Sequence, residues 1–329
     1  NITHTYDLFT KTYIDFLSFL YFIFPSHVIG NLASVLAWFL SAILVVKIMS
    51  LLTDNKNSYL IALVIYTLLP SSIFYTSITI REPFQLLFLN LSVFAALKIL
   101  KYNYYYWLVL FPSVLILSSL HKAFLLVSLV VILLTVIFSA LSINKNYLYT
   151  KLSIYLFFFT FLSSLGFYIF NTYGYALHMG IVERVKSFNI GVLYYEARTS
   201  YKTMNEFHNI YDFFYFIFKS FIQYMFEPFP WRRNIELIDL GLIFENCLRL
   251  FLIYKSFTIF FKKNIGNQKG LIFIFLIYII TEFIWSLGTA NWGQASRHHI
   301  PSIGLLVATP FAFNFIAFRS NKIFRKKFF

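Results

Sequence analysis

The chain has 329 residues, of which 59% are hydrophobic, 22% aromatic and only 12% charged. Soluble domains carry about a quarter of their residues as charged side chains, so this composition excludes a soluble globular enzyme, a disordered protein and a nucleic-acid-binding module. We therefore expect an all-α, polytopic helical membrane protein, and the net charge of +14 has to be explained within it.

The predicted elements are membrane-spanning helices, each of which needs about 20 mostly apolar residues. Nine stretches meet this length and predict a single transmembrane domain over residues 1–329. They lie near residues 28–52, 58–80, 83–101, 104–120, 123–142, 148–170, 236–261, 271–288 and 300–318. Two further apolar stretches, 13–25 and 211–227, are shorter or interrupted, the second by Lys219.

The positive charge indicates the orientation, because cytoplasmic loops are enriched in Lys and Arg. If 13–25 and 211–227 do not cross, more than half of the 27 basic residues fall on one side with a single acid, Asp54. These basic residues are Lys47, Lys56, Lys98, Lys101, Lys145, Lys151, Lys255, Lys262, Lys263, Lys269, Arg319, Lys322, Arg325, Lys326 and Lys327. We expect a cytoplasmic C-terminus, and the segment 1–27 and a long loop over 171–235 on the outer face. The two doubtful stretches become interfacial or re-entrant pieces there.

Other sequence features bear on the source of the protein and on its cysteine and metal chemistry. Lys, Asn, Tyr, Phe and Ile are abundant relative to Gly, Ala and Arg, which is associated with an AT-rich coding region and fits a bacterial inner-membrane protein. The chain begins at Asn1 rather than Met, and we expect an N-terminal truncation that removes a first span. The single cysteine, Cys247, has no zinc-ligand pattern around it. We expect no cofactor and no metal.

Two charged pairs flank expected spans on the outer side. Arg81 and Glu82 precede Pro83, which suits the first turn of a helix. The pair is either an ion pair at a helix boundary or an arginine that holds a phosphate and is oriented by its glutamate. His121 and Lys122 form a tight turn that either contacts lipid headgroups or adds positive charge for an anionic lipid carrier.

The long outer loop combines aromatic and charged residues. Arg198 and Tyr201 lie in one part of it, and Trp231 and Arg232 follow a Pro-Phe-Pro stretch in another. Sugar rings offer apolar faces to aromatic side chains, and their hydroxyls take paired hydrogen bonds from arginine and carboxylates. The loop predicts a saccharide site, and the alternative is an aromatic belt with anchoring arginines.

Further candidates lie near both ends of the chain. Arg297 and His298 are expected at a helix start, where an anion can bind both side chains and the helix dipole. His299 next to His298 also permits a metal, which we discount because adjacent helical residues face different ways. Asp7 and Asp15 are candidate general bases for an acceptor hydroxyl.

Three ionisable residues fall inside expected spans, where such groups are costly. Glu245 and Arg249 are four residues apart, and Glu282 lies in the next span. They are either functional or, for the first two, a mutually neutralised structural pair.

Several short motifs carry a resemblance to a known group. A span that ends Leu-Pro-Ser-Ser-Ile-Phe-Tyr is followed by the Arg81-Glu82 pair, and related stretches occur at 228–231 and 288–301. Over roughly residues 1–110 and 190–310 the layout resembles membrane glycosyltransferases of the GT-C type and bacterial surface-polysaccharide enzymes such as O-antigen polymerases. The resemblance implies polyprenyl-phosphate-linked sugar donors and a catalytic acid in the first outer loop, which Asp7 matches best and Asp15 second.

From these features we expect a membrane glycosyltransferase or polymerase. Its partners would be a polyprenyl-linked saccharide donor, a saccharide or lipid-linked acceptor and membrane lipid, with no nucleic acid. The alternative is a non-enzymatic transporter or flippase of lipid-linked saccharides, with a polar pathway lined by Glu245, Arg249 and Glu282.

Overall fold

The computed structural model describes residues 8–101, 103–140, 198–201, 210–232, 235–258 and 268–311. Within these ranges the regular structure is helical, and one isolated β-bridge pairs Ser200 with Asn291. The helices are α1 (Leu8–Ile23), α2 (His27–Leu52), α3 (Lys56–Leu68), α4 (Pro70–Thr76), α5 (Glu82–Leu100), the 3₁₀ turn η1 (Tyr104–Tyr106), α6 (Trp107–Leu120), α7 (Lys122–Ala140), α10 (Ile210–Phe226), α11 (Leu237–Phe257), α12 (Gln268–Gly288), α13 (Trp292–His298) and the 3₁₀ turn η4 (Ile300–Ser302). Residues 303–311 continue as a helix.

Local capping explains where several helices begin. Ser26 accepts a hydrogen bond from the Val28 amide at the start of α2, and Asn55 accepts one from Asn57 at the start of α3. Asn291 caps α13 through the Gln294 amide. Such side chains satisfy amides that have no partner within the helix.

Helix α2 shows the inverted pattern of a helix in lipid. Its buried face carries small residues, among them Gly30, Ser34, Ala37 and Ser41. Its exposed face carries large apolar residues, namely Val28, Leu32, Val35, Leu36, Phe39, Leu40 and Ile43. Small residues let helices approach closely in a membrane, where lipid covers the apolar outer face.

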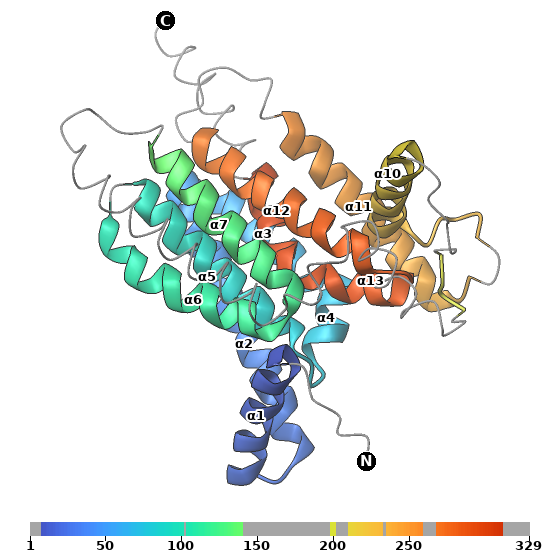
Figure 1. Ribbon diagram of the computed structural model, residues 1–329, viewed down its shortest axis with the longest axis horizontal. Helices are drawn as coiled ribbons and strands as arrows, with labels where there is room; N and C mark the ends of the chain where they lie inside the picture. The colour runs from blue at the N-terminus through green and yellow to red at the C-terminus, as the bar shows by residue number, and fades with distance from the viewer. Residues whose placement is uncertain are drawn as a thin grey trace, which may run out of the picture.

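Helix α5 lies at the centre of the bundle. It packs against α2, α6, α7 and η4, and the first three are seen near it in Figure 1. Its buried residues include Leu86, Leu89 and Val93, but also Glu82 and Gln85. Because α5 is surrounded by other helices, Glu82 and Gln85 in its first turns are buried within the protein. A cluster of charged side chains forms around Glu82.

Helices α10, α11 and α13 lie together on the side of the bundle away from α6, while α1 extends beyond it (Figure 1). The expected interfacial stretches 13–25 and 211–227 form α1 and α10. Helix α10 exposes Tyr211, Phe214, Tyr215 and Phe218. The position of either helix relative to a membrane stays a prediction.

Four of the described helices, α2, α5, α7 and α12, are long and apolar enough to cross a membrane. A fifth span results if α3 and α4, which are bent by 62° across a short break, count as one. The part of the chain that the structure describes is therefore all-helical, and its long apolar helices indicate a multi-pass membrane protein, whereas the expected number of nine spans stays a prediction.

Among the other expected spans, some are shorter or carry charged residues, and one lies outside the described residues. The stretch 104–120 is a shorter apolar helix, and 236–261 corresponds to α11, which carries Asp239, Glu245 and Arg249. The stretch 148–170 lies outside the described residues, as does the greater part of the expected outer loop 171–235.

Candidate functional site

A cavity of about 500 Å³ forms where three segments that are distant in sequence meet. The segment 198–201 pairs with the start of α13, since the Tyr201 amide donates to the Ala290 carbonyl (3.0 Å) and the Trp292 amide to the Thr199 carbonyl (3.1 Å). The end of α10 and the loop after it complete the wall. The lining residues are Arg198, Ser200, Gln223, Glu227, Phe229, Trp231, Arg232 and Trp292.

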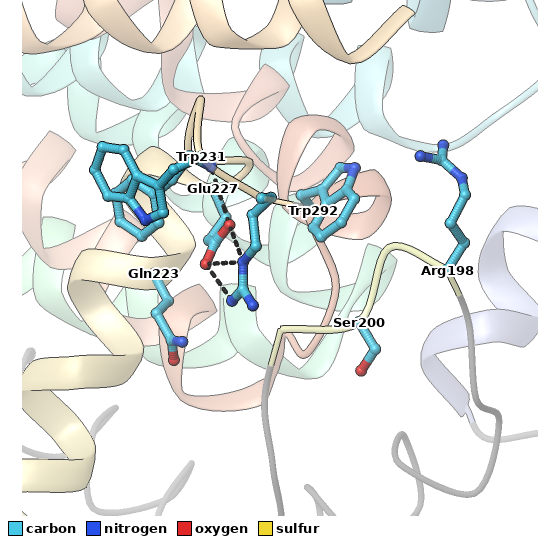
Figure 2. Close-up of a pocket in the computed structure, with 8 residues that line it drawn as sticks. Arg198, Ser200, Gln223, Glu227, Trp231 and Trp292 are labelled. Atoms are coloured by element: carbon cyan, nitrogen blue, oxygen red, sulfur yellow. Dashed lines mark hydrogen bonds and ion pairs between the residues drawn. The ribbon is translucent and has the colours of Figure 1, made fainter. Parts of the chain in front are cut away.

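The Glu227 carboxylate is the central charge of this pocket and lies between Trp231 and Trp292 in the view of Figure 2. Arg232 donates from Nε to Oε1 (3.0 Å) and Oε2 (3.1 Å) and from Nη2 to Oε1 (2.5 Å). The Phe229 amide also donates to Oε2 (3.1 Å). The hydrogen bond to Glu227 raises the pKa of Arg232. Because the carboxylate is buried and fully hydrogen-bonded, it fixes the arginine and does not act as a free base.

A second acid, Asp239, contacts two residues on the other side of the pocket. Asp239 accepts from Arg198 Nη1 (2.6 Å) and from the Glu236 amide (2.9 Å), and its other oxygen accepts from Trp292 Nε1 (3.0 Å). The Arg198 guanidinium lies 5.9 Å from the centre of the Trp292 ring. Asp239 therefore orients both an arginine and a tryptophan that line the pocket.

The aromatic lining has an exposed and a buried part. Trp231 is 77% exposed and stacks on Phe229 with ring centres 4.8 Å apart, whereas Trp292 is buried. Tyr201, expected to contact a saccharide, is buried instead, and its hydroxyl donates to the Thr289 carbonyl (3.2 Å). Tyr201 therefore packs beneath the pocket and does not line it. The prediction that Tyr201 contacts a saccharide is wrong, because its ring is buried and its hydroxyl bonds to the protein backbone.

A second charged cluster brings together Arg81, Glu82 and Arg297. Nε of Arg297 lies 3.0 Å from Oε1 of Glu82, and Nε of Arg81 lies 4.0 Å from the same oxygen. The Glu82 side chain is 2% exposed, while those of Arg81 and Arg297 are 23% and 36% exposed. Two arginines facing one carboxylate leave an excess positive charge that is partly accessible, and arginine side chains of this kind can pair with an anion through charge-assisted hydrogen bonds.

Three rings in contact lie beside this cluster. Trp285 stacks on His298 with ring centres 3.9 Å apart, and His121 is tilted against Trp285 at 4.5 Å. Burial, Arg81 and other nearby cations lower the pKa of His121 to about 3. Burial and Arg297 likewise lower the pKa of His298. Both rings are therefore neutral at physiological pH and do not contribute positive charge.

A helical segment does follow Arg297 and His298, beginning with η4 at Ile300, but neither residue is part of it. Both lie in the last turn of α13, which is the end with the negative dipole. His298 is buried, and its Nδ1 lies 2.9 Å from the Thr289 hydroxyl. Of these two residues only Arg297 offers charge to a ligand.

Helix α13 contributes to both the pocket and the cluster of Arg81, Glu82 and Arg297. Trp292 at its first turn lines the pocket and Arg297 in its last turn contacts Glu82, so they are separated by about 7.5 Å along the axis at 1.5 Å per residue. The Tyr75 hydroxyl contacts the Gly293 carbonyl (3.2 Å) and the Ser296 hydroxyl (2.8 Å) and fixes α13 to α4.

The other candidates are exposed or lie outside the described residues. Asp7 lies outside them, and Asp15 is exposed on α1, where it makes no hydrogen bond or ion pair with any residue the structure describes. Lys122 is exposed at the first turn of α7. In the described ranges no three His, Cys, Asp or Glu side chains gather as a metal site.

Sequence reasoning did not assign Glu227, Gln223, Trp292 or Asp239 to the site. The only local signal is the spacing of Glu227 from Arg232 in a loop rich in proline and aromatic residues. The contribution of Asp239 depends on a contact between α11 and the segment 198–201, which no local pattern reveals. No family model matches the sequence, and no curated protein and no solved structure matches the chain.

Proposed function

We propose that the protein is a membrane glycosyltransferase that transfers a saccharide from a polyprenyl phosphate or pyrophosphate carrier to an acceptor, on the outer face of the bacterial inner membrane during cell-surface polysaccharide assembly. The observation that carries the proposal is the pocket between Trp231, Trp292, Glu227, Arg198 and Arg232. It has the size of a small-ligand site, with aromatic faces for sugar rings and fixed polar groups for hydroxyls.

The neighbouring pair of Arg81 and Arg297 supplies the second requirement of this reaction. The leaving group of a lipid-linked donor is an anion, so its departure needs charge neutralisation more than proton donation. Glu82 keeps both arginines in place while neutralising only one of them. Helix α13 carries a residue of each site, and the proposal places the sugar of one substrate in the pocket and its phosphate at this cluster.

The proposed base remains an aspartate of the N-terminal segment, Asp7 first and Asp15 second. The two pocket acids do not suit this task, since Glu227 and Asp239 are each hydrogen-bonded to an arginine and to at least one further donor. A general base needs a free lone pair within reach of the acceptor hydroxyl.

The transporter alternative is favoured by a separate observation. Glu245, Arg249 and Glu282 are all at most 3% exposed within the bundle, and ionisable groups among membrane helices often mark a transport pathway. Glu245 and Arg249 neutralise one another at 3.2 Å, which is equally expected of a structural pair.

One experiment separates the two functions. The purified protein is reconstituted in liposomes with a radiolabelled hexose on a polyprenyl phosphate and an oligosaccharide acceptor, without a membrane gradient. A glycosyltransferase forms a new glycosidic bond. Movement of label across the bilayer without a new bond supports the transporter and contradicts the proposal.

A further inference from the structure

Glu282 and His299 form a buried pair that neither cluster above includes. Glu282 lies in α12 and is fully buried, and His299, between α13 and η4, is 3% exposed. Oε2 of Glu282 contacts Nδ1 of His299, and Oε1 contacts the Ser302 hydroxyl. The other ring nitrogen of His299, Nε2, lies 3.2 Å from the carbonyl oxygen of Tyr224 at the end of α10.

These contacts require a proton between the two side chains. A carbonyl oxygen only accepts hydrogen bonds, so Nε2 of His299 must carry a hydrogen to bond Tyr224. In a neutral imidazole Nδ1 is then an acceptor, and it faces Glu282, whose ionised carboxylate is also only an acceptor. Two acceptors in contact repel one another. Either Glu282 is protonated or His299 is doubly protonated, and in both cases the pair holds one additional proton.

The charges around the pair also indicate that it holds one additional proton. Glu245 accepts from the Ser71 amide (3.1 Å), the Ser71 hydroxyl (2.6 Å) and Arg249 Nη2 (3.2 Å). Arg249 directs Nη1 to the Met225 carbonyl (3.3 Å) and to Asn246 Oδ1 (2.6 Å). Among the described residues, the arginine that acts on His299 is Arg249, and it is already paired with Glu245. A deprotonated pair of Glu282 and His299 would be an uncompensated negative charge in an apolar interior, which is strongly unfavourable.

We propose that Glu282 and His299 form a proton-binding site inside the helix bundle, which holds one proton at neutral pH and, while it is protonated, positions the α10 wall of the pocket. In the arrangement with a neutral His299 ring the proton lies on Oε2 of Glu282, and burial and the adjacent Arg249 lower the pKa of that ring. The carboxyl then donates to Nδ1 and accepts from Ser302, and each polar atom of the pair has a partner.

The link to the pocket runs through the last turn of α10. The final carbonyls of a helix have no partner within it. Here the Tyr224 carbonyl accepts from His299, that of Met225 from Arg249, and that of Glu227 from Asn246 Nδ2 (3.0 Å). Gln223 and Glu227 of the pocket belong to this segment. Loss of the proton as pH rises places a negative charge beside this anchor and is expected to loosen it.

The titratable and charged groups that face the pair come from each helix packed around it. They are Tyr224 of α10, Glu245 and Arg249 of α11, Tyr278 of α12 and His298 of α13. Only Tyr224, Tyr278 and His298 among them carry no charge at neutral pH. They do not replace the missing countercharge, so the pair is the group expected to titrate as alkali is added.

The site is tested on the purified full chain by infrared spectroscopy and by ¹⁵N nuclear magnetic resonance of the histidines. The expected result is the carbonyl stretch of a protonated carboxyl group that disappears in Glu282→Gln, together with a neutral His299 protonated at Nε2. Thr281→Ala is the matched control and should keep the band, because the Thr281 hydroxyl on the same helix donates to the Ile277 carbonyl and not to the pair. An imidazolium at His299 also supports a held proton, whereas an ionised Glu282 beside a neutral His299 overturns the proposal. The ¹⁵N spectrum of the unaltered protein decides this even if Glu282→Gln does not fold.

The coupling to the pocket is tested with a reporter. The exposed Cys247 is replaced by serine, and Trp231→Cys carries a fluorophore that senses its environment. A fluorescence step is expected at the alkaline pH at which the carboxyl band is lost. Glu282→Gln should abolish the step, because its amide donates to Nδ1 at every pH. A step that persists in Glu282→Gln overturns the coupling, and neither measurement depends on glycosyl transfer.

Discussion

Nε of Arg297 lies 3.0 Å from Oε1 of Glu82, although one residue ends α13 and the other begins α5. Glu82 is buried and also faces Arg81 at 4.0 Å. One buried acid therefore contacts two arginines that are far apart in the sequence. Because a single carboxylate neutralises only one of them, the cluster keeps a positive charge for an anionic group.

Replacement of Arg297 by alanine should lower the rate of glycosyl transfer by about 10²–10³-fold, as for other single donors that stabilise developing negative charge. Arg297→Lys should restore only part of the rate, because lysine lacks the planar fork that binds phosphate through two hydrogen bonds. Lys47→Ala, an exposed cation on α2, is the control. Unchanged transfer in both Arg81→Ala and Arg297→Ala contradicts the assigned roles.

Replacement of Glu227 by glutamine should weaken the pocket, because Arg232 loses its charged partner. Hydrogen bonds to charged groups are worth about 1.5–3 kcal/mol, and the partial exposure of Arg232 favours the lower end. We expect a small decrease in the free energy of unfolding and a larger decrease in transfer. Arg232→Lys should behave similarly, since Nε and Nη2 both contact the carboxylate. Denaturant titration and the transfer assay measure the two effects.

Trp231 should act on substrate and not on stability. It is 77% exposed, and substitutions at such positions change the free energy of unfolding by about 0.5 kcal/mol or less. Loss of one stacking face in Trp231→Ala should weaken binding of an oligosaccharide acceptor by about tenfold, equivalent to about 1.4 kcal/mol. Tyr105→Ala, an 84% exposed aromatic residue remote from the pocket lining, serves as the control. Equal binding by the two variants, measured by calorimetry, would remove Trp231 from the site.

The sequence predicts the helical membrane class well because composition and apolar length depend on local residues alone. It predicts α2, α5, α7 and α12 close to their observed bounds. It does not predict the break between α3 and α4, where the apolar stretch 58–80 continues through the bend before Pro70. Hydropathy measures transfer into lipid and not the direction of the chain.

The site was predictable only where a residue and its partner are neighbours in sequence. The pairing of Glu245 with Arg249 follows from helical spacing, and the structure confirms it at 3.2 Å. The internal use of Tyr201 and His298 and the part played by Asp239 depend on contacts between distant segments. The pairing of Arg81 with Glu82 was expected from their adjacency, whereas the contact of Arg297 with the same carboxylate emerges only from packing.

The buried Glu245–Arg249 pair should be sensitive to removal of one partner. Both side chains are at most 3% exposed, and breaking such a pair costs about 3–5 kcal/mol because the remaining charge is left without compensation. Glu245→Gln should therefore lower the free energy of unfolding strongly, and it also weakens the link to Ser71 of α4. The double variant Glu245→Leu/Arg249→Leu should lose less. Ser256→Ala on the same helix is the control, and a double variant that is less stable than either single one would contradict the argument.

Acid should destabilise the protein through His121. Its Nδ1 accepts from the Ala123 amide (3.1 Å) at the start of α7, so the folded state uses the neutral ring. Burial lowers the pKa of His121 from 6.5 to about 3, and between these values the unfolded chain binds the extra proton. Stability is then complete above pH 6.5 and falls as pH decreases towards 3, with a slope of about 1.4 kcal/mol per pH unit for one proton. His121→Asn keeps an acceptor for the Ala123 amide but does not titrate, so its acid slope should be smaller by about one proton, while His298 maintains the rest. Denaturant titrations at several acid pH values measure both slopes, and identical slopes would show that His121 is already charged in the folded protein.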